Sequence, residues 1–224
     1  MRKNSIIALL FTCTASFAQE TTPAFYDDIL AFRKQDSLQV PPKNVILFVG
    51  SSSFTQWTDV QDYFPKHTII NRGFGGSTLL DVIRYSKEVI LTYQPKQIVL
   101  YCGENDLASS DTVTAQMVLH RFKQLFKIIR KSDPAVPVAF VSLKPSPNRK
   151  HLWPKMEKAN QLINAYLRTK MNTSFIDVYH KMFNSDGTVM NDIFIEDDLH
   201  MNAKGYAIWK KSIQPYLIQI NHKK

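Results

Sequence analysis

Five short apolar runs, rich in Val and Ile, recur along this 224-residue chain, with segments of amphipathic helical periodicity between them. The runs occupy residues 45–49, 68–70, 97–101, 138–143 and 175–178. Continuous apolar runs of this kind are typical of strands that are buried on both faces. Because strand and helix alternate, the crossovers should be right-handed and the sheet mostly parallel. The pattern predicts a three-layer α/β/α sandwich around a five-stranded sheet.

The clearest helical segment lies between the third and fourth runs, where apolar side chains recur with the i, i+3, i+4, i+7 spacing of one helix face. These side chains are Ala115, Val118, Leu119, Phe122, Leu125, Phe126 and Ile129. Similar patterns predict helices over residues 79–91, 155–169 and 203–213, and a shorter one over 26–35. No repeat or linker divides the sequence, so we predict a lead-in at 19–43 and one domain over 44–224.

The first 18 residues have the features of a secretory signal peptide. These features are the basic Arg2 and Lys3, an apolar stretch over 6–11, and small residues at Ser16 and Ala18. We expect cleavage after Ala18 and export to the periplasm or the extracellular space. A lipoprotein anchored through Cys13 is the alternative. No later segment has the roughly 18 continuous apolar residues that an integral membrane helix needs.

The charge of the chain is basic, but its basic residues are scattered. The formal charge of +9 falls to +7 once Arg2 and Lys3 are removed. No run of lysines is longer than two, so we expect a solvated basic surface and no nucleic-acid partner. With Cys13 in the removed segment, Cys102 is alone, which excludes an intramolecular disulfide and any multi-cysteine metal site.

Four short segments carry the side chains with catalytic chemistry. They are residues 50–53 (Gly-Ser-Ser-Ser), 71–76 (Asn-Arg-Gly-Phe-Gly-Gly), 103–106 (Gly-Glu-Asn-Asp) and 197–200 (Asp-Asp-Leu-His). The first three directly follow apolar runs, and the fourth comes after the fifth run, just before the last helix. Since ligands bind outside the carboxyl ends of the strands in such a sheet, we expect the four segments to share one rim.

The first three segments offer a nucleophile and groups that donate hydrogen bonds. A serine at a sharp strand-to-helix turn can act as a nucleophile, although spacing alone does not choose among Ser51, Ser52 and Ser53. The glycines of 71–76 expose amides that can approach a ligand closely, with a simple tight turn as the alternative. Asn105 can donate to an oxyanion without changing charge, with a turn or cap role as the alternative.

Asp197 and His200 are three residues apart, so one loop can hold the carboxylate beside the imidazole and fix its tautomer. A metal site would need further ligands, and no second histidine lies nearby, so we expect no metal here. The other histidines lack an acidic partner at useful spacing and are interpreted as surface or packing residues. They are His67, His120, His151, His180 and His222.

Taken in order, the four segments resemble those of the SGNH hydrolases, also called the GDSL esterase/lipase family. The sequence looks most similar to the branch that includes the platelet-activating-factor acetylhydrolase catalytic subunits, and Asn202, Gly205 and Tyr206 continue its last segment. This resemblance implies a flavodoxin-like fold. It also implies the roles of individual residues: Ser52 as nucleophile, Asp197 as orienting acid, His200 as base, and Ser52, Gly76 and Asn105 as oxyanion donors.

One position departs from the family pattern. The first block of the family usually reads Gly-Asp-Ser, whereas position 51 is Ser here. That aspartate is not the acid of the triad, so we expect the change to alter local hydrogen bonding more than the mechanism.

The resemblance implies a secreted serine esterase that cleaves short-chain, above all acetyl, esters of carbohydrate or lipid substrates through an acyl-serine intermediate. The mechanism that it implies requires no metal or organic cofactor. An O-acyltransferase with the same residues is one alternative. A non-catalytic glycan- or lipid-binding protein on the hydrolase scaffold is another. The stretch 144–149 should lie on the active rim and is interpreted as a proline-stiffened loop, with substrate contact as the alternative.

Overall fold

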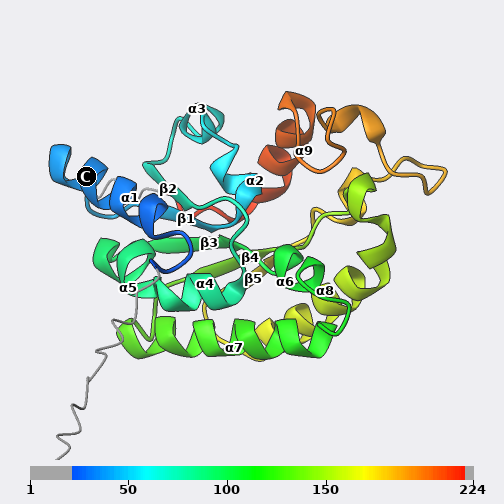
Figure 1. Ribbon diagram of the computed structural model, residues 1–224. Coiled ribbons are helices and arrows are strands. Elements are labelled where there is room, and N and C mark those ends of the chain that lie inside the picture. The colour runs from blue at the N-terminus through cyan, green and yellow to red at the C-terminus, as the bar shows by residue number, and fades with distance from the viewer. Residues whose placement is uncertain (1–21, 220–224) are drawn as a thin grey trace, which may run out of the picture.

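The computed structural model describes residues 22–219, so the predicted signal peptide and Cys13 lie outside the described residues. One sheet has the strand order β2-β1-β3-β4-β5, and each neighbouring pair is parallel (Figure 1). The strands are β1 (Ile46–Gly50), β2 (Ile69–Gly73), β3 (Gln97–Tyr101), β4 (Val138–Val141) and β5 (Thr173–Ile176). This is the flavodoxin-like order, so the predicted fold class is confirmed.

Helices cover both faces of the sheet (Figure 1). One face carries α4 (Leu79–Arg84), α5 (Ser86–Val89), α7 (Ala115–Ser132) and α8 (Trp153–Leu167), and the other carries α2 (Ser52–Thr55), α3 (Val60–Tyr63) and α9 (Ala203–Ile213). Helix α1 (Tyr26–Leu38) lies beside the β2 edge, and α6 (Glu104–Ala108) follows β3. Short 3₁₀ segments are η1 (Leu91–Tyr93), η2 (Pro147–Leu152), η3 (His180–Met182), η4 (Asn191–Ile193) and η5 (Gln214–Tyr216).

The helical periodicity is confirmed most clearly in α7, where the seven side chains that predicted one face are the buried ones. The single helix expected over 79–91 is wrong, because the chain leaves helical geometry at Tyr85 (φ −100°, ψ 16°) and divides into α4, α5 and η1. The second strand runs on to Gly73, past its predicted end at residue 70. It is an edge strand, and the polar Asn71 and Arg72 have partners within the protein there.

Aromatic side chains fill the layer between the sheet and helices α2 and α9. The cluster includes Phe48, Phe54, Trp57, Phe64, Tyr101, Tyr206 and Trp209. Each buried ring removes a large apolar area from water, and tilted or edge-to-face pairs add a further contribution. This packing fixes α9, the last helix, against the short helix that follows β1.

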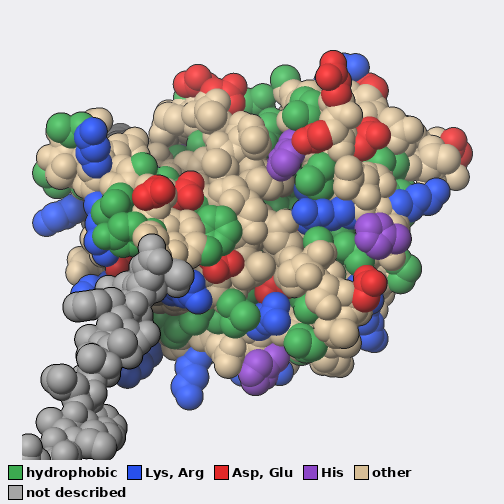
Figure 2. Space-filling model, in the orientation of Figure 1, with side chains coloured by type: hydrophobic (Ala, Val, Ile, Leu, Met, Phe, Trp, Pro, Cys, Tyr) green, Lys and Arg blue, Asp and Glu red, His purple; other side chains and the backbone are tan. Residues whose placement is uncertain are grey.

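The surface of the protein mixes both signs of charge. On the face shown in Figure 2, Lys and Arg side chains are dispersed among acidic and neutral ones. Within residues 22–219, no helix has both the length and the apolar character required to cross a bilayer.

Gly50 at the end of β1 allows the chain to turn into α2. Its φ is 144°, and an added Cβ would lie 1.8 Å from the carbonyl oxygen of Tyr101 on β3. This close approach also lets the Ser51 N–H donate to the same oxygen at 3.0 Å. A side chain at position 50 would therefore force β1 and β3 apart where the two strands lead into the loops of the rim.

We expect Gly50→Ala to lower the free energy of unfolding by more than about 4 kcal/mol, because backbone rather than a movable side chain blocks the new methyl group. Urea denaturation followed by circular dichroism measures this loss. Gly187→Ala is the control, since Gly187 also has a positive φ of 81° but no atom lies within 4 Å of the added Cβ. That change should cost only about 1 kcal/mol. Equal losses in the two variants would contradict the steric argument.

Candidate active site

Of the three serines that follow β1, Ser52 is the one that a substrate can reach. Ser51 and Ser53 are 2% and 1% exposed, whereas Ser52 is partly exposed. Ser52 is the first residue of α2, so its N–H has no partner within the helix, and neither this N–H nor the side-chain hydroxyl makes a hydrogen bond to another described residue. Ser51 is the N-cap of α2, but its side chain makes no capping hydrogen bond.

Asp197 and His200 form a hydrogen-bonded pair in one tight loop. Asp197 Oδ2 lies 2.6 Å from His200 Nδ1, and Asp197 Oδ1 accepts from the N–H groups of Leu199 and His200 at 2.9 and 2.8 Å. Partial burial raises the pKa of the Asp197 carboxyl, but these hydrogen bonds outweigh that effect and lower it to about 2. The carboxylate is therefore ionised at neutral pH, and it favours the tautomer of His200 in which Nδ1 carries the proton.

The second nitrogen of His200 has no hydrogen-bond partner in the described part of the chain. Nε2 is buried and makes no hydrogen bond to any residue of 22–219, Ser52 included. A neutral imidazole with its proton on Nδ1 has a lone pair on Nε2, which can accept a proton. Hydrogen bonds between a nucleophile and its base are often longer without substrate and tighten in the bound complex.

Contacts between α9 and α2 bring the histidine loop and Ser52 to the same side of the sheet (Figure 1). Tyr206 in α9 donates its hydroxyl to the carbonyl oxygen of Ser53 at 3.0 Å, and its ring stacks on Trp57 at 4.7 Å between centroids. His200 lies on the loop just before α9. Tyr206, which continues the last segment in the sequence, is therefore a bridge between the two parts of the site.

The start of α9 is itself held firmly. The side chain of Asn202 caps the helix by accepting from the N–H of Lys204 at 2.9 Å, and it donates to the carbonyl of Asp192 at 2.8 Å. Gly205 packs so closely that an added Cβ would lie 2.6 Å from the carbonyl oxygen of Ile193. These two residues fix where the loop of Asp197 and His200 ends.

Gly76 and Asn105 offer further donors at the same rim. Gly76 follows β2 with a φ of 83°, a conformation that favours glycine, and its N–H makes no hydrogen bond within the described part of the chain. Asn105 lies in the first turn of α6, where its Nδ2 donates to the carbonyl of Ser77 at 3.0 Å. The amide of Asn105 thus lies beside the glycine loop, as a shared rim requires.

A buried ionic cluster underlies Asn105. Glu104 Oε2 accepts from Lys144 Nζ at 2.8 Å and from the hydroxyl of Tyr101. Its Oε1 accepts from Ser146 Oγ at 3.2 Å and forms an ion pair with Arg149 Nη1, also at 3.2 Å. Burial raises the pKa of the Glu104 carboxyl, but the ammonium and the guanidinium outweigh it and lower the pKa below its ordinary value. Glu104 is therefore ionised and joins α6 to the loop that follows β4.

The loop over 144–149 makes hydrogen bonds to the last of the four segments. Its Asn148 donates through the backbone N–H to the carbonyl of Asp198 at 3.0 Å and through Nδ2 to the carbonyl of Asp197 at 3.1 Å. The loop thus clamps the segment that carries His200. These contacts could not be predicted from the sequence, because every residue has a backbone carbonyl and the residue type does not show which carbonyl accepts a hydrogen bond.

One interpretation from the sequence is wrong. His180 does have an acidic partner, since its Nδ1 lies 2.7 Å from Asp177 Oδ2, with the same three-residue spacing as the pair in the last segment. The histidine side chain of this second pair is 66% exposed, against 18% for His200. The lead-in also reaches the rim, because the ring of Phe25 lies 3.8 Å from the position of a Cβ on Gly76.

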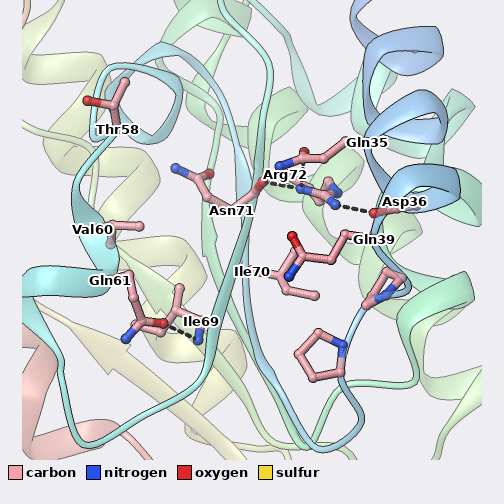
Figure 3. Close-up of a pocket in the computed structure, with 12 residues that line it drawn as sticks. Gln35, Asp36, Gln39, Thr58, Val60, Gln61, Ile69, Ile70, Asn71 and Arg72 are labelled. Atoms are coloured by element: carbon pink, nitrogen blue, oxygen red, sulfur yellow. Dashed lines mark hydrogen bonds and ion pairs between the residues drawn. The ribbon is translucent and has the colours of Figure 1, made fainter.

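A cavity of about 340 Å³ lies away from these residues, between α1 and β2 (Figure 3). Figure 3 shows Arg72 directed towards Asp36, with which it forms an ion pair. Asn71 is also satisfied, because its Nδ2 donates to the carbonyl of Phe54 at 2.6 Å. The polar groups of this cavity hold α1 on the edge strand, so Asn71 and Arg72 of the second segment are structural.

Among the described residues, no group of three or more His, Cys, Asp and Glu side chains could hold a metal ion.

Comparison with known proteins identifies the family of this chain. The sequence model of the GDSL-like lipase/acylhydrolase family matches residues 49–208. Platelet-activating factor acetylhydrolase IB subunit alpha1 of Pongo abelii is 26% identical over 184 residues, which cover 78% of this chain and 76% of that protein. A GDSL-like lipase from Bacteroides thetaiotaomicron has a similar structure, with a TM-score of 0.70, 19% identity, and coverage of 84% of this chain and 96% of that one.

An acetyl-xylooligosaccharide esterase variant from Geobacillus Stearmophilus is also similar in structure. Its TM-score is 0.63 at 12% identity, with 83% of this chain and 100% of that one covered. At these identities the two structures show a common fold. The family match covers most of the chain, including all four segments that carry the candidate site. The chain therefore belongs to the GDSL-like lipase/acylhydrolase family and is a carboxylic ester hydrolase.

Proposed function

We propose that this protein is an exported serine esterase that removes short acyl groups, above all acetyl, from carbohydrate or lipid esters. One observation carries the assignment of its catalytic residues. His200 Nδ1 is held by Asp197, while the buried Nε2 has no partner within residues 22–219. A group in this state accepts a proton from a nearby hydroxyl, and α9 is packed against the helix that begins with Ser52.

The proposed reaction is acyl transfer in two steps. Ser52 Oγ attacks the ester carbonyl carbon as His200 Nε2 takes the hydroxyl proton, and the carbonyl oxygen becomes an oxyanion. The N–H groups of Ser52 and Gly76 and the Nδ2 of Asn105 stabilise this charge. Collapse of the intermediate expels the alcohol, which takes the proton from His200. A water molecule then attacks the acyl-serine, with His200 as base again, and releases the carboxylic acid.

Two features support a short acyl group. Phe25 packs its ring on Phe74 at 5.4 Å between centroids and stands against Gly76, so an aromatic wall borders the donor loop. In addition, two of the similar proteins are named for an acetyl group, one as an acetylhydrolase and one as an acetyl-xylooligosaccharide esterase. The N-terminal pattern over residues 1–18 supports export, which is consistent with an extracytoplasmic ester.

Rates on p-nitrophenyl acetate, butyrate, octanoate and laurate, beside acetylated xylooligosaccharides, test this proposal. We expect kcat/KM to fall by about tenfold or more between acetate and octanoate, because longer chains must fit against the aromatic wall. Ser52→Ala provides the blank. A higher rate on laurate than on acetate would reject the short-chain assignment. Acetyl groups found on an added sugar instead of in free acetate would identify a transferase.

A further inference from the structure

A guanidinium lies against the amide of Asn105. Arg149 Nη2 donates to Asn105 Oδ1 at 2.9 Å, and Arg149 Nη1 lies 3.2 Å from Glu104 Oε1. On the other side of the amide, Asn105 Nδ2 donates to the carbonyl of Ser77 at 3.0 Å. The Arg149 side chain is only 17% exposed, so water competes weakly for these donors.

These contacts determine how the carboxamide of Asn105 is oriented. A guanidinium only donates hydrogen bonds and a carbonyl only accepts them, so Oδ1 must face Arg149 and Nδ2 must face Ser77. Two contacts on opposite atoms also prevent rotation of the amide plane. Nδ2 carries two hydrogens, and Ser77 takes one of them. The other makes no hydrogen bond within the described chain and is free to face an oxyanion.

Arg149 also changes the charge beside Asn105. Glu104 is neutralised by Lys144 at 2.8 Å, so the guanidinium leaves this cluster with one surplus positive charge. Its hydrogen bond to Oδ1 draws electrons from the amide and makes the Nδ2 hydrogens stronger donors. Fixed donors of this kind stabilise developing negative charge without reorganising during the reaction.

We propose that Arg149 is a positioning residue for ester hydrolysis, which fixes and polarises the Asn105 amide so that Nδ2 faces the oxyanion. This inference rests on the assignment of Asn105 as an oxyanion donor in the proposed function. The oxyanion exists in the transition state and not in the bound ester, so the effect of Arg149 belongs in kcat rather than in KM.

A double-mutant cycle with Asn105 tests the inference. Arg149→Met should lower kcat about 10- to 100-fold, a smaller loss than the roughly 100- to 1000-fold expected for Asn105→Ala, with KM changed by less than about twofold. In the Asn105→Ala background, the same Arg149→Met change should alter kcat by no more than about twofold, because its target is gone. Arg149→Lys keeps a charge but cannot bridge Asn105 and Glu104 with one planar group, so it should lose most of the same activity.

Ser146→Ala is the matched control. It removes another hydrogen bond to Glu104 Oε1 from the same loop, at 3.2 Å, without touching Asn105. Its kcat should stay within about twofold of the unaltered enzyme. Labelling of the active serine by a fluorophosphonate counts folded sites in each variant. If Arg149→Met does not fold, Arg149→Lys takes its place in the double-mutant cycle.

Each result separates this inference from the proposed function. Full kcat in Asn105→Ala would remove the oxyanion assignment, and the inference with it. A large loss in Asn105→Ala beside an unchanged kcat in Arg149→Met would overturn the inference alone. If the fold-losses of kcat for Arg149→Met and Asn105→Ala multiplied in the double variant, Arg149 would not act through Asn105, and the inference would be overturned. Full activity in Arg149→Lys would show that the charge suffices without the bridge, which also overturns the inference.

Discussion

Ser52→Ala is expected to lower kcat by three to six orders of magnitude, while the protein stays folded. In the proposed reaction this hydroxyl forms the covalent intermediate, and neither neighbouring serine is expected to replace it, since Ser51 and Ser53 are buried. Removing one partly exposed oxygen from the first residue of α2 leaves the packing of α9 unchanged. Steady-state rates on p-nitrophenyl acetate measure the loss, and circular dichroism checks the fold.

Ser51→Ala is the matched control for this change. Ser51 lies one residue earlier and makes no capping hydrogen bond with its side chain, so its loss should change kcat by less than about threefold. A fluorophosphonate should label the unaltered enzyme and Ser51→Ala, but not Ser52→Ala. Full activity in Ser52→Ala, or a label that moves to another residue, would reject Ser52 as the nucleophile.

His200→Ala is expected to reduce kcat to about the same extent, because the nucleophile and its base act as a unit and the loss of either one removes the mechanism. The imidazole is the group with an unpartnered nitrogen at the rim, and no other described histidine lies on the loop that precedes α9. The double variant with Ser52→Ala should lose little more than either single variant. If the fold-loss of kcat in the double variant equalled the product of the two single losses, Ser52 and His200 would act independently, which would contradict this expectation.

The chain contains its own control for His200. His180 and Asp177 repeat the three-residue spacing and the Nδ1–Oδ2 contact, at 2.7 Å against 2.6 Å for the pair of Asp197 and His200. His180→Ala should nevertheless leave kcat within about twofold, because its ring is exposed and lies in η3, apart from the loop that precedes α9. A large loss in His180→Ala and none in His200→Ala would mean that the second pair is the reactive one.

Periodicity alone predicted most of the fold. The face of α7 was predicted residue by residue, because a helix packed on a sheet must show its apolar side chains every three to four residues. The helix at residues 79–91 was predicted less well. The same apolar spacing continues across Tyr85, where the backbone leaves the helix, and hydrophobic spacing does not report such a local change in φ and ψ.

The candidate site was only partly visible before the structure. The side chains with reactive groups could be named from four segments, but the choice of Ser52 over its neighbours by geometry needs burial, which depends on the packing of α2. The bridge from Tyr206 to Ser53 joins residues 153 positions apart. The two carboxylates beside Asn105 were equally hard to assign from the sequence. Glu104 pairs with Lys144, whereas Asp106 pairs with Arg121, and both partners lie far away along the chain.

The sequence by itself determined the order of strands and helices and the chemical types at the rim, because hydrophobic period and residue type are local properties of the chain. Tertiary structure alone decided which of two similar Asp–His pairs has a largely buried histidine, and which arginine contacts the amide of Asn105. Those outcomes depend on contacts between segments that are far apart along the chain. The position of each side chain in such a contact depends on packing and hydrogen bonds from several elements, so it cannot be predicted from one segment alone.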